Sequence, residues 1–240
     1  MTPDTAIVLA AGLGRRMRPL TDTRPKPLVE VHGKPLLDHG LDALAAAGVG
    51  EAIVNVHYLA DQIQAHVARR ESPRVTLSDE RERLLDSGGG VAHALGQTSA
   101  QTVLLLNADT FWIDGPGESN IARLARAWDP PRMDMLLLLA PLDRAVGHST
   151  GRGDFAADAE GRLARSADGL VYAGVAVLKR SIFAGDEGAV HSLNLHFDRL
   201  IERGRLHGVA MDGLWLTVGT PDAIGEAEAA IDAWRGGRAA

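Results

Sequence analysis

The sequence of 240 residues contains no cysteine. This absence excludes disulfide bonds, thiolate nucleophiles, iron–sulfur clusters and cysteine-ligated zinc, so any metal ion must be held by oxygen or imidazole ligands. Hydrophobic residues make up 45% of the chain and charged residues 23%. Both values are close to those of average globular proteins, and they disfavour disordered and fibrous classes.

The chain also lacks a long apolar segment. No run approaches the roughly 20 residues that are needed to span a bilayer, and the first residues lack the basic stretch that opens a signal peptide. These two features predict a soluble, cytoplasmic protein with no membrane partner. The formal net charge of -6 disfavours a nucleic-acid partner, because affinity for nucleic acid comes mainly from a basic surface.

Lysine is scarce, since Lys26, Lys34 and Lys179 are the only examples. Basic residues nevertheless gather near the start of the chain, as Arg15, Arg16, Arg18, Arg24 and Lys26. A local cluster of this kind can bind a small anion even in an acidic protein. Because arginine is the usual cation of this chain, the lysine at position 26 indicates a need for its particular shape.

Strand and helix patterns alternate through the first part of the chain. Apolar runs predict strands at residues 6–11, 52–56, 74–77, 103–106 and 133–139. Helical spacing predicts helices at residues 36–47, 60–68, 121–128 and, after a glycine loop, 91–95. The alternation is typical of βαβ units, and it predicts an α/β fold with a Rossmann-like, mainly parallel sheet and helices on both faces.

The pattern changes after Pro141, where glycines separate short apolar segments such as LVYAGVAVL. This punctuation favours hairpins over helical crossovers. A chain of this length suits a single domain. We therefore expect one domain over residues 1–240, with a core at 1–145, a small β lobe at 146–220 and a C-terminal helix at 221–236.

The first predicted strand runs directly into a loop that contains Gly12 and Gly14. Ligands of open α/β sheets bind beyond the carboxyl ends of the strands, and glycine lets backbone N–H groups approach phosphate oxygens closely. A dinucleotide-binding loop would have a third glycine where Met17 stands, and a P-loop would continue with Gly-Lys-Ser/Thr. The loop therefore supports neither a Rossmann dehydrogenase nor a Walker ATPase.

Lys26 lies between Pro25 and Pro27. The two prolines fix the backbone, which reduces the entropy lost when the ammonium group is held against an anion. Alone, the tripeptide is more typical of a stiff surface loop with a solvated lysine. Together with the arginine-bearing glycine loop, it predicts a phosphate ligand.

Residues 9–35, LAAGLGRRMRPLTDTRPKPLVEVHGKP, resemble the signature of the sugar-1-phosphate nucleotidyltransferases. The resemblance continues through the glycine run at 87–90, the strand end at 106–109, GRGDF at 151–155 and WLTVGTP at 215–221, so it covers most of the chain. It implies a nucleotide-diphospho-sugar transferase fold with a nucleotide-binding core and a sugar-binding lobe. It also implies an enzyme that joins a nucleoside triphosphate to a sugar 1-phosphate and releases pyrophosphate, with Mg2+, or alternatively Mn2+, as cofactor.

The site residues follow from this resemblance position by position. The nucleotide-binding residues would be Ala10, Ala11, Gly12, Gly14, Arg16, Lys26 and Gly88. Gly12 and Gly14 would offer backbone donors to the triphosphate, and Gly88 would lie in a loop near the base. Arg16 would hold the β and γ phosphates and Lys26 would reach the α phosphate, so both would be catalytic, together with Asp109.

The resemblance also implies the substrate-binding residues Asn107, Asp154 and Gly174, which would contact the sugar or its phosphate. Asp154 suits a sugar hydroxyl or amide, although Gly-Asp is also common in solvated turns. The chain's histidines show no ligand spacing such as HExxH, so we expect them at the surface or in polar parts of the core.

Asp109 follows the apolar strand predicted at 103–106, where a buried carboxylate needs a partner such as Mg2+. It resembles the metal-binding aspartate of the family, although a strand-end aspartate can also cap a turn. The chain departs from the family at Thr217, where a second metal-binding aspartate is usual. Because Mg2+ needs only one or two carboxylates besides phosphates and water, we assign Asp109 alone as metal ligand.

Within the family, the opening motif, the GGG run, GRGDF and the shortness of the chain most resemble the branch that acts on N-acetylmuramate 1-phosphate in peptidoglycan recycling. This branch implies UTP as the nucleotide and a monomer or weak homodimer. A mannose-1-phosphate guanylyltransferase is the nearest alternative. A second alternative, based on Thr217, is a nucleotide-sugar binding protein with weakened catalysis.

Overall fold

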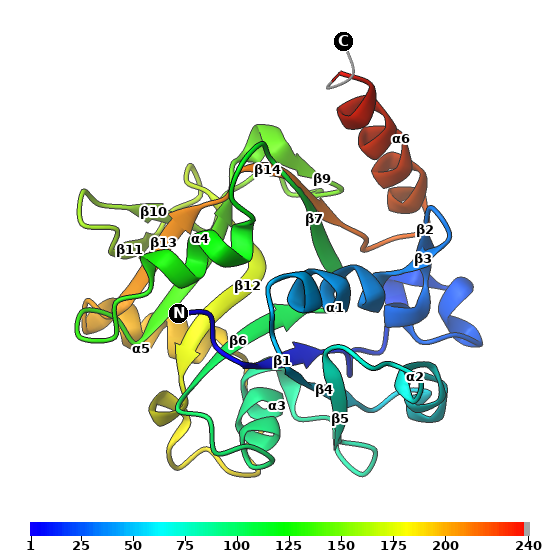
Figure 1. Cartoon of the computed structure of the whole chain (residues 1–240), viewed down its shortest axis with the longest axis horizontal. Helices are drawn as coiled ribbons and strands as arrows, with labels where there is room; N and C mark the ends of the chain where they lie inside the picture. The colour runs from blue at the N-terminus through cyan, green and yellow to red at the C-terminus, as the bar shows by residue number, and fades with distance from the viewer. Residues whose placement is uncertain (238–240) are drawn as a thin grey trace.

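A seven-stranded sheet with the order β13-β8-β12-β6-β1-β4-β5 runs through the molecule (Figure 1). The computed structural model describes residues 1–237. The strands of this sheet are β1 (Thr5–Leu9), β4 (Glu51–Val56), β5 (Arg74–Asp79), β6 (Thr102–Asn107), β8 (Met135–Ala140), β12 (Val171–Lys179) and β13 (Leu206–Ala210). Only β12 runs antiparallel to its neighbours, β6 and β8, in this sheet of the described chain. The predicted α/β fold with a mainly parallel sheet is confirmed.

Helices cover both faces of the sheet. One face carries α1 (Leu36–Ala46), α2 (Ala60–Val67) and α4 (Asn120–Ala127), and the other carries α3 (Asp86–Leu95) and α5 (Asn194–Glu202). Alternate side chains of a strand point to opposite faces. In β1, Ala6 and Val8 belong to one buried cluster with Leu37, whereas Ile7 belongs to the other with Val91. Figure 1 shows α1 and α4 together on the near side of the sheet.

Residues 146–220, where we expected a small β lobe, divide between the central sheet and two smaller sheets. Residues 171–178 of the segment LVYAGVAVL belong to β12 of the central sheet, so the prediction of a hairpin is wrong for this segment, whereas residues 155–165 do form an antiparallel hairpin. The continuous apolar run of β12 reflects burial on both faces of the sheet. β14 (Gly213–Thr217) pairs with β7 (Thr110–Asp114) and β9 (Ala145–Val146), and β10 (Phe155–Ala157) pairs with β11 (Leu163–Arg165).

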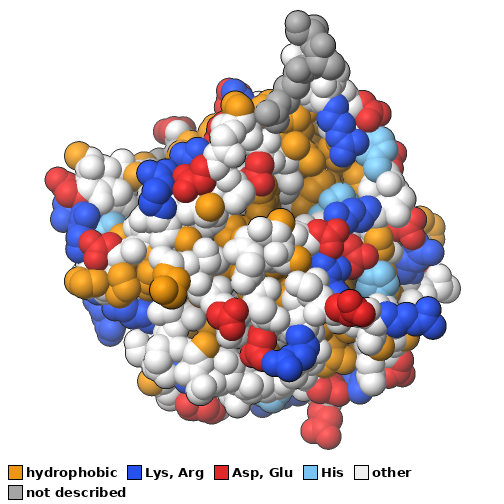
Figure 2. Space-filling model, viewed as in Figure 1, with side chains coloured by type: hydrophobic (Ala, Val, Ile, Leu, Met, Phe, Trp, Pro, Cys, Tyr) orange, Lys and Arg blue, Asp and Glu red, His pale blue; other side chains and the backbone are white. Residues whose placement is uncertain are grey.

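The C-terminal helix predicted at 221–236 is confirmed as α6 (Asp222–Gly236). Ala227 and Ile231 share a buried cluster with Leu216 and Val218, so α6 packs on the sheet that contains β14. Figure 2 shows hydrophobic side chains in the hollow beside α6, while cations and anions mix over much of the rest of that face. Within residues 1–237 no helix has the length and apolarity needed to cross a bilayer.

The remaining elements are short. They are the two-residue strands β2 (Glu30–Val31) and β3 (Lys34–Pro35), which pair with each other, and the 3-10 turns η1 (Arg15–Met17), η2 (Leu20–Asp22), η3 (Lys26–Leu28), η4 (Leu142–Arg144) and η5 (Arg180–Phe183). Three of these turns, η1 to η3, lie within the loop between β1 and β2. The predicted phosphate-binding motif therefore folds as a series of tight turns.

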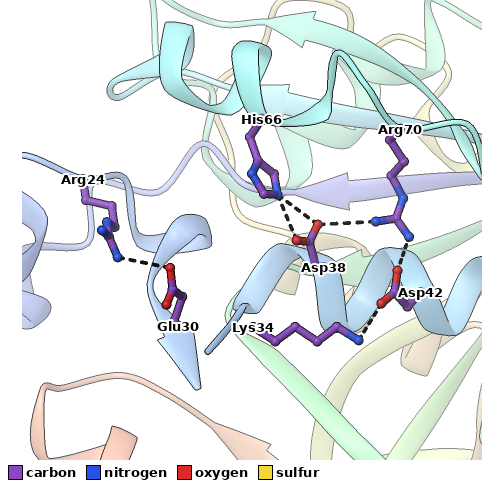
Figure 3. Close-up of polar contacts among 7 residues, drawn as sticks. All are labelled: Arg24, Glu30, Lys34, Asp38, Asp42, His66 and Arg70. Atoms are coloured by element: carbon purple, nitrogen blue, oxygen red, sulfur yellow. Dashed lines mark hydrogen bonds and ion pairs between the residues drawn. The ribbon is translucent and has the colours of Figure 1, made fainter. Parts of the chain in front are cut away.

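A charged network joins α1 to α2 and the turn that follows it (Figure 3). Asp38 and Asp42 lie one turn apart on α1, so both carboxylates face the same way. His66 Nε2 lies 2.9 Å from Asp38, and Arg70 pairs with both aspartates. Lys34 reaches Asp42 from β3. The network fixes the helices that cover the β4-β5 side of the sheet.

We expected the glycine run to form a loop. It lies instead inside the first turns of α3, which begins at Asp86. Glycine normally weakens a helix, yet close packing requires it here. A Cβ atom at Gly89 would lie 2.2 Å from the carbonyl oxygen of Ala189, and one at Gly90 would lie 2.7 Å from Nδ2 of Asn55. The prediction that Gly88 occupies a loop is wrong for the same reason.

Candidate active site

The strand order reverses at β1, which has β4 on one side and β6 on the other. The connections that leave β1 and β6 therefore diverge, and such a point opens a crevice at the carboxyl ends of the strands. A cavity of about 280 Å3 lies there. It is lined by the ends of β1 and β6, by Lys26 and Pro27, by Asn55 of β4 and by the start of α3.

Lys26 and Asp109 meet at this cavity. Lys26 is only 8% exposed, and its Nζ atom lies 2.7 Å from Oδ2 of Asp109. A buried ammonium group requires such a partner. The carboxylate of Asp109 is 40% exposed and has a second oxygen. The structure thus places a fixed cation beside a carboxylate that can still bind another group.

Buried polar side chains hold the loop that follows β1. Oδ1 of Asn55 accepts the backbone N–H groups of Ala10 and Ala11 at 2.6 and 3.2 Å. Nδ2 of Asn55 donates to Glu80 at 2.7 Å, and the other oxygen of Glu80 accepts the N–H of Leu85 at 3.0 Å. Neither Asn55 nor Glu80 was among the predicted site residues. The available signal was a single amide within the otherwise apolar strand at 52–56.

The two glycines of this loop have different surroundings. A Cβ atom at Gly12 would meet no atom within 4 Å, and Gly12 lines the cavity. Gly14 does not line the cavity, and its φ is 61°. A Cβ atom added to Gly14 would lie only 3.0 Å from Cβ of Lys26. Thr21 donates its hydroxyl to the carbonyl of Gly14 at 2.8 Å. Gly12 thus faces free space, whereas Gly14 lets the loop fold closely onto Lys26.

Arg16 is exposed on η1 and does not line the cavity. Its Nη1 atom would lie 3.3 Å from a Cβ added to Gly219. The neighbouring residue Val218 donates its N–H to the carbonyl of Asp109 at 3.2 Å. Arg16 therefore lies outside the cavity lining, next to the chain segment that supports Asp109.

Thr217 lies beside Asp109 in space. Thr217 is the last residue of β14, and its partner on β7 is Thr110, the residue that follows Asp109. The carboxylate of Asp109 and the hydroxyl of Thr217 are hard oxygen donors, the class that binds Mg2+ or Ca2+. One carboxylate at the mouth of a cavity fits an ion whose other ligands are phosphates and water.

A second pocket, of about 240 Å3, shares Ser87 and Asn107 with the first cavity. Asp154 also lines it, and its Oδ2 atom accepts the backbone N–H of Tyr172 at 2.9 Å. Gly174 has a φ of 75°, and a Cβ there would lie 3.1 Å from Cβ of Asn107. The structure therefore brings Asn107 and Asp154 to one pocket, whereas Gly174, the third residue expected on the sugar side, packs against Asn107 and lines neither pocket. Gly88 lines neither pocket.

Arg165, which was not among the predicted site residues, also lines the second pocket. Its guanidinium group lies 4.7 Å from the ring centroid of Phe155 and donates to Asp198 and Asn194 at 2.9 and 2.8 Å. These bonds use two of its five N–H donors. The Tyr172 hydroxyl is buried without a hydrogen-bond partner among residues 1–237, and burial raises the pKa of Tyr172. The pocket can thus offer donors to an anionic or hydroxyl-bearing ligand.

Known proteins that are similar to this chain are nucleotidyltransferases. Residues 6–146 match the MobA-like NTP transferase domain. The N-acetylmuramate alpha-1-phosphate uridylyltransferase of Caulobacter vibrioides is 46% identical over 236 residues, which cover 95% of this chain and 97% of that protein. The enzyme of the same name from Neisseria meningitidis is 33% identical, with coverage of 96% and 99%. The solved structure of a UDP-glucose pyrophosphorylase complexed with UDP-glucose is 15% identical, with a TM-score of 0.79 over 96% of this chain and 98% of that chain, and it supports the fold.

Proposed function

The chain belongs to the sugar-1-phosphate nucleotidyltransferases with a MobA-like NTP transferase domain, and from this premise we propose that it joins UTP to N-acetylmuramate α-1-phosphate. The products are UDP-N-acetylmuramate and pyrophosphate. The observation that carries this proposal is the Lys26–Asp109 pair in a cavity that adjoins a second pocket lined by a cation, Arg165. The two relatives of that name support the choice of substrates.

In the proposed reaction, a phosphate oxygen of the sugar phosphate attacks the α phosphorus of UTP. The bond from this phosphorus to the bridging oxygen breaks, and pyrophosphate leaves. Attack brings two anions together, and two unit charges about 4 Å apart repel by about 4 kcal/mol at an effective dielectric constant of about 20. Such a barrier is equivalent to about a thousandfold in rate.

Lys26 supplies positive charge where this repulsion arises. Because its backbone is fixed by two prolines and its side chain is almost buried, little reorganisation is needed when the substrates bind. We assign the α phosphate to Lys26 and the outer phosphates to Arg16, which lies next to the segment that supports Asp109. Gly12, which faces open space, offers close approach of the backbone to the triphosphate.

Asp109 is our proposed ligand for Mg2+, with Thr217 beside it. When bound, the ion neutralises charge on the phosphate oxygens. The ion pair with Lys26 uses Oδ2 of Asp109 and leaves the carboxylate 40% exposed, so its second oxygen can bind the ion. Mn2+, which also prefers oxygen ligands, is a suitable replacement.

The second pocket is our proposed sugar site. N-acetylmuramate carries a carboxylate on its lactyl ether, and Arg165 is the cation among the pocket's lining residues. A guanidinium group is well suited to a carboxylate. Asn107 and Asp154 provide polar contacts for the sugar hydroxyls or its acetamido group. We place this activity in the cytoplasm, as a step in the recycling of peptidoglycan sugars.

The direct test measures pyrophosphate release from the purified protein with UTP, GTP, CTP and ATP, each combined with a panel of sugar 1-phosphates. We expect the highest kcat/KM with UTP and N-acetylmuramate α-1-phosphate. Preference for GTP with mannose 1-phosphate would replace this proposal by the guanylyltransferase. Tight binding without pyrophosphate release at any Mg2+ or Mn2+ concentration would instead indicate a protein that has lost catalysis.

A further inference from the structure

Asp186, His191 and His196 form a cluster that lines neither pocket of the proposed reaction. Asp186 and His191 belong to the segment between η5 and α5, and His196 lies in the first turn of α5. Their side chains are 18%, 12% and 2% exposed. We expected the histidines to lie at the surface or in polar core, and their spacing in the sequence matches no ligand motif. A loop and a helix bring them together.

The distances within the cluster suit a tetrahedral metal ion. The Nε2 atoms of His191 and His196 lie 3.0 Å apart, and Oδ2 of Asp186 lies 3.1 Å from His196 Nε2 and 3.7 Å from His191 Nε2. Ligand atoms bound at about 2.0–2.1 Å to a tetrahedral zinc ion lie about 3.3–3.4 Å apart. The three distances between the ligand atoms, 3.0, 3.1 and 3.7 Å, lie on either side of this value.

Hydrogen bonding alone accounts for the cluster less well. A proton on Nε2 of His196 can be donated to Nε2 of His191, at 3.0 Å, or to the buried Oδ2 of Asp186, at 3.1 Å, but not fully to both. The acceptor that is left without this proton is a buried polar atom that lacks a full hydrogen bond, which is costly. A cation between the three groups satisfies the Asp186 oxygen and both ring nitrogens at once.

The donor types select the metal. Two imidazoles and one carboxylate suit zinc and other transition metals, whereas Mg2+ and Ca2+ prefer sites made of oxygen. Three protein ligands leave a fourth position for water. We propose that Asp186, His191 and His196 bind one Zn2+ ion, at a site separate from the metal site at Asp109.

The backbone around these ligands supports the start of α3. The carbonyl oxygen of His191 accepts the N–H groups of Gly88 and Gly89 at 2.9 and 3.1 Å. The N–H of Leu193 donates to Oγ of Ser87 at 2.9 Å. Because Ser87 lines both pockets, an ion at this cluster fixes a wall that the two pockets share.

The test measures Zn2+ binding by the full chain after removal of metals with a chelator, using calorimetry and metal analysis with Mg2+ in excess. We expect one Zn2+ per chain in the wild-type protein and in Asp109→Asn. His191→Gln and Asp186→Asn should each weaken binding at least tenfold. The control His93→Gln, which changes an exposed histidine of α3, should bind as the wild type does.

A second measurement covers the case in which a variant fails to fold. Co2+ replaces Zn2+ in the wild-type protein, and a tetrahedral site gives it strong visible absorption that added Zn2+ removes. Zn2+ should also raise the Tm of the wild type and not that of folded His191→Gln. Absence of Zn2+ binding and of this absorption in the wild type overturns the proposal, as does unchanged binding in folded His191→Gln and Asp186→Asn.

Discussion

At the scale of single residues, Lys26 is where sequence and structure agree most closely. Pro25 and Pro27 set its backbone, Gly14 makes room for it, and Asp109 neutralises it at 2.7 Å. These contacts hold an ammonium group ready at the mouth of a cavity before any substrate binds. Preorganised charge of this kind acts mainly on the transition state.

Lys26→Ala should therefore lower kcat far more than it alters folding. We expect a loss of about a hundredfold to a thousandfold, which corresponds to about 3–4 kcal/mol of transition-state stabilisation. Steady-state pyrophosphate release measures it. Lys34→Ala is the matched control, because Lys34 is partly exposed and pairs with Asp42 away from the cavity. A Lys26→Ala enzyme with normal kcat contradicts the assignment.

Arg165→Met tests the sugar site and rests on the proposed function. Hydrogen bonds to charged groups contribute about 1.5–3 kcal/mol, so KM for N-acetylmuramate 1-phosphate should rise by about tenfold to a hundredfold. Activity with N-acetylglucosamine 1-phosphate, which lacks the lactyl carboxylate, should change little. Arg162→Met, at an exposed arginine paired with Asp158, serves as control. Equal loss with both sugars would show that Arg165 does not read the carboxylate.

Thr217→Asp should restore a second carboxylate beside Asp109. If this position faces the ion, the Mg2+ concentration for half-maximal activity should fall by about tenfold, because an ionised ligand binds Mg2+ better than a hydroxyl does. Titration of activity with Mg2+ measures the change. Thr220→Asp, at an exposed position three residues later, is the control. An unchanged Mg2+ titration would mean that residue 217 does not reach the ion.

The residues that sequence reasoning found and those that it missed differ in how their partners are spaced. Lys26, Asn107 and Asp109 belong to short motifs, one in the loop after β1 and one at the end of β6, and the fold brings them to one cavity. Asn55 and Glu80 act through each other, 25 residues apart, and neither stands in a motif. The roles of the motif residues in catalysis remain predictions until the variants are measured.

At the scale of elements, Asp134 connects three strands at one side of the sheet. It precedes β8, and its carboxylate binds Lys179 at the end of β12 and Arg205 just before β13, at 2.7 and 3.0 Å. Hydrogen bonds from Arg205 and Lys179 hold the pKa of Asp134 below its ordinary value of 3.8, although partial burial raises it. The depressed pKa means that folding favours the ionised form.

Asp134→Asn should lower the free energy of unfolding by about 1–2 kcal/mol at neutral pH. Since the folded-state pKa is depressed, the stabilisation is complete above the unfolded-state pKa and disappears as the pH falls through the folded-state value. The difference between wild type and variant should therefore shrink in acid. Urea unfolding across this pH range measures it, with the exposed Asp168→Asn as control. A difference that is independent of pH contradicts the account.

The sequence predicted most elements of the first half because the apolar residues there repeat with the spacing of strands or of helices. The sequence-based prediction was wrong where one sequence feature is compatible with two different structures. The glycines at 87–90 indicated a loop, but they allow tight packing of α3 against Asn55 and Ala189. The apolar run of β12 indicated a hairpin, but its burial between β6 and β8 depends on strands far away in the sequence.

At the scale of the whole molecule, the fold aligns two pockets along one edge of the sheet. The first lies where the connections of β1 and β6 diverge, and the second extends toward β12 and α5, with Ser87 and Asn107 between them. A nucleotide sugar has the same order of parts, with phosphates between the nucleoside and the sugar. In the proposed complex, Lys26 and Arg16 would bind these phosphates although the whole chain carries a formal charge of -6.

A crystal structure of the protein with UDP-N-acetylmuramate and Mg2+ tests this arrangement most directly. We predict the diphosphate of the product between Lys26 and Asp109, the ion on the Asp109 carboxylate, and the lactyl carboxylate within hydrogen-bond distance of Arg165. A product bound elsewhere, or bound in the cavity with no phosphate near Lys26 and Asp109, would contradict the proposal.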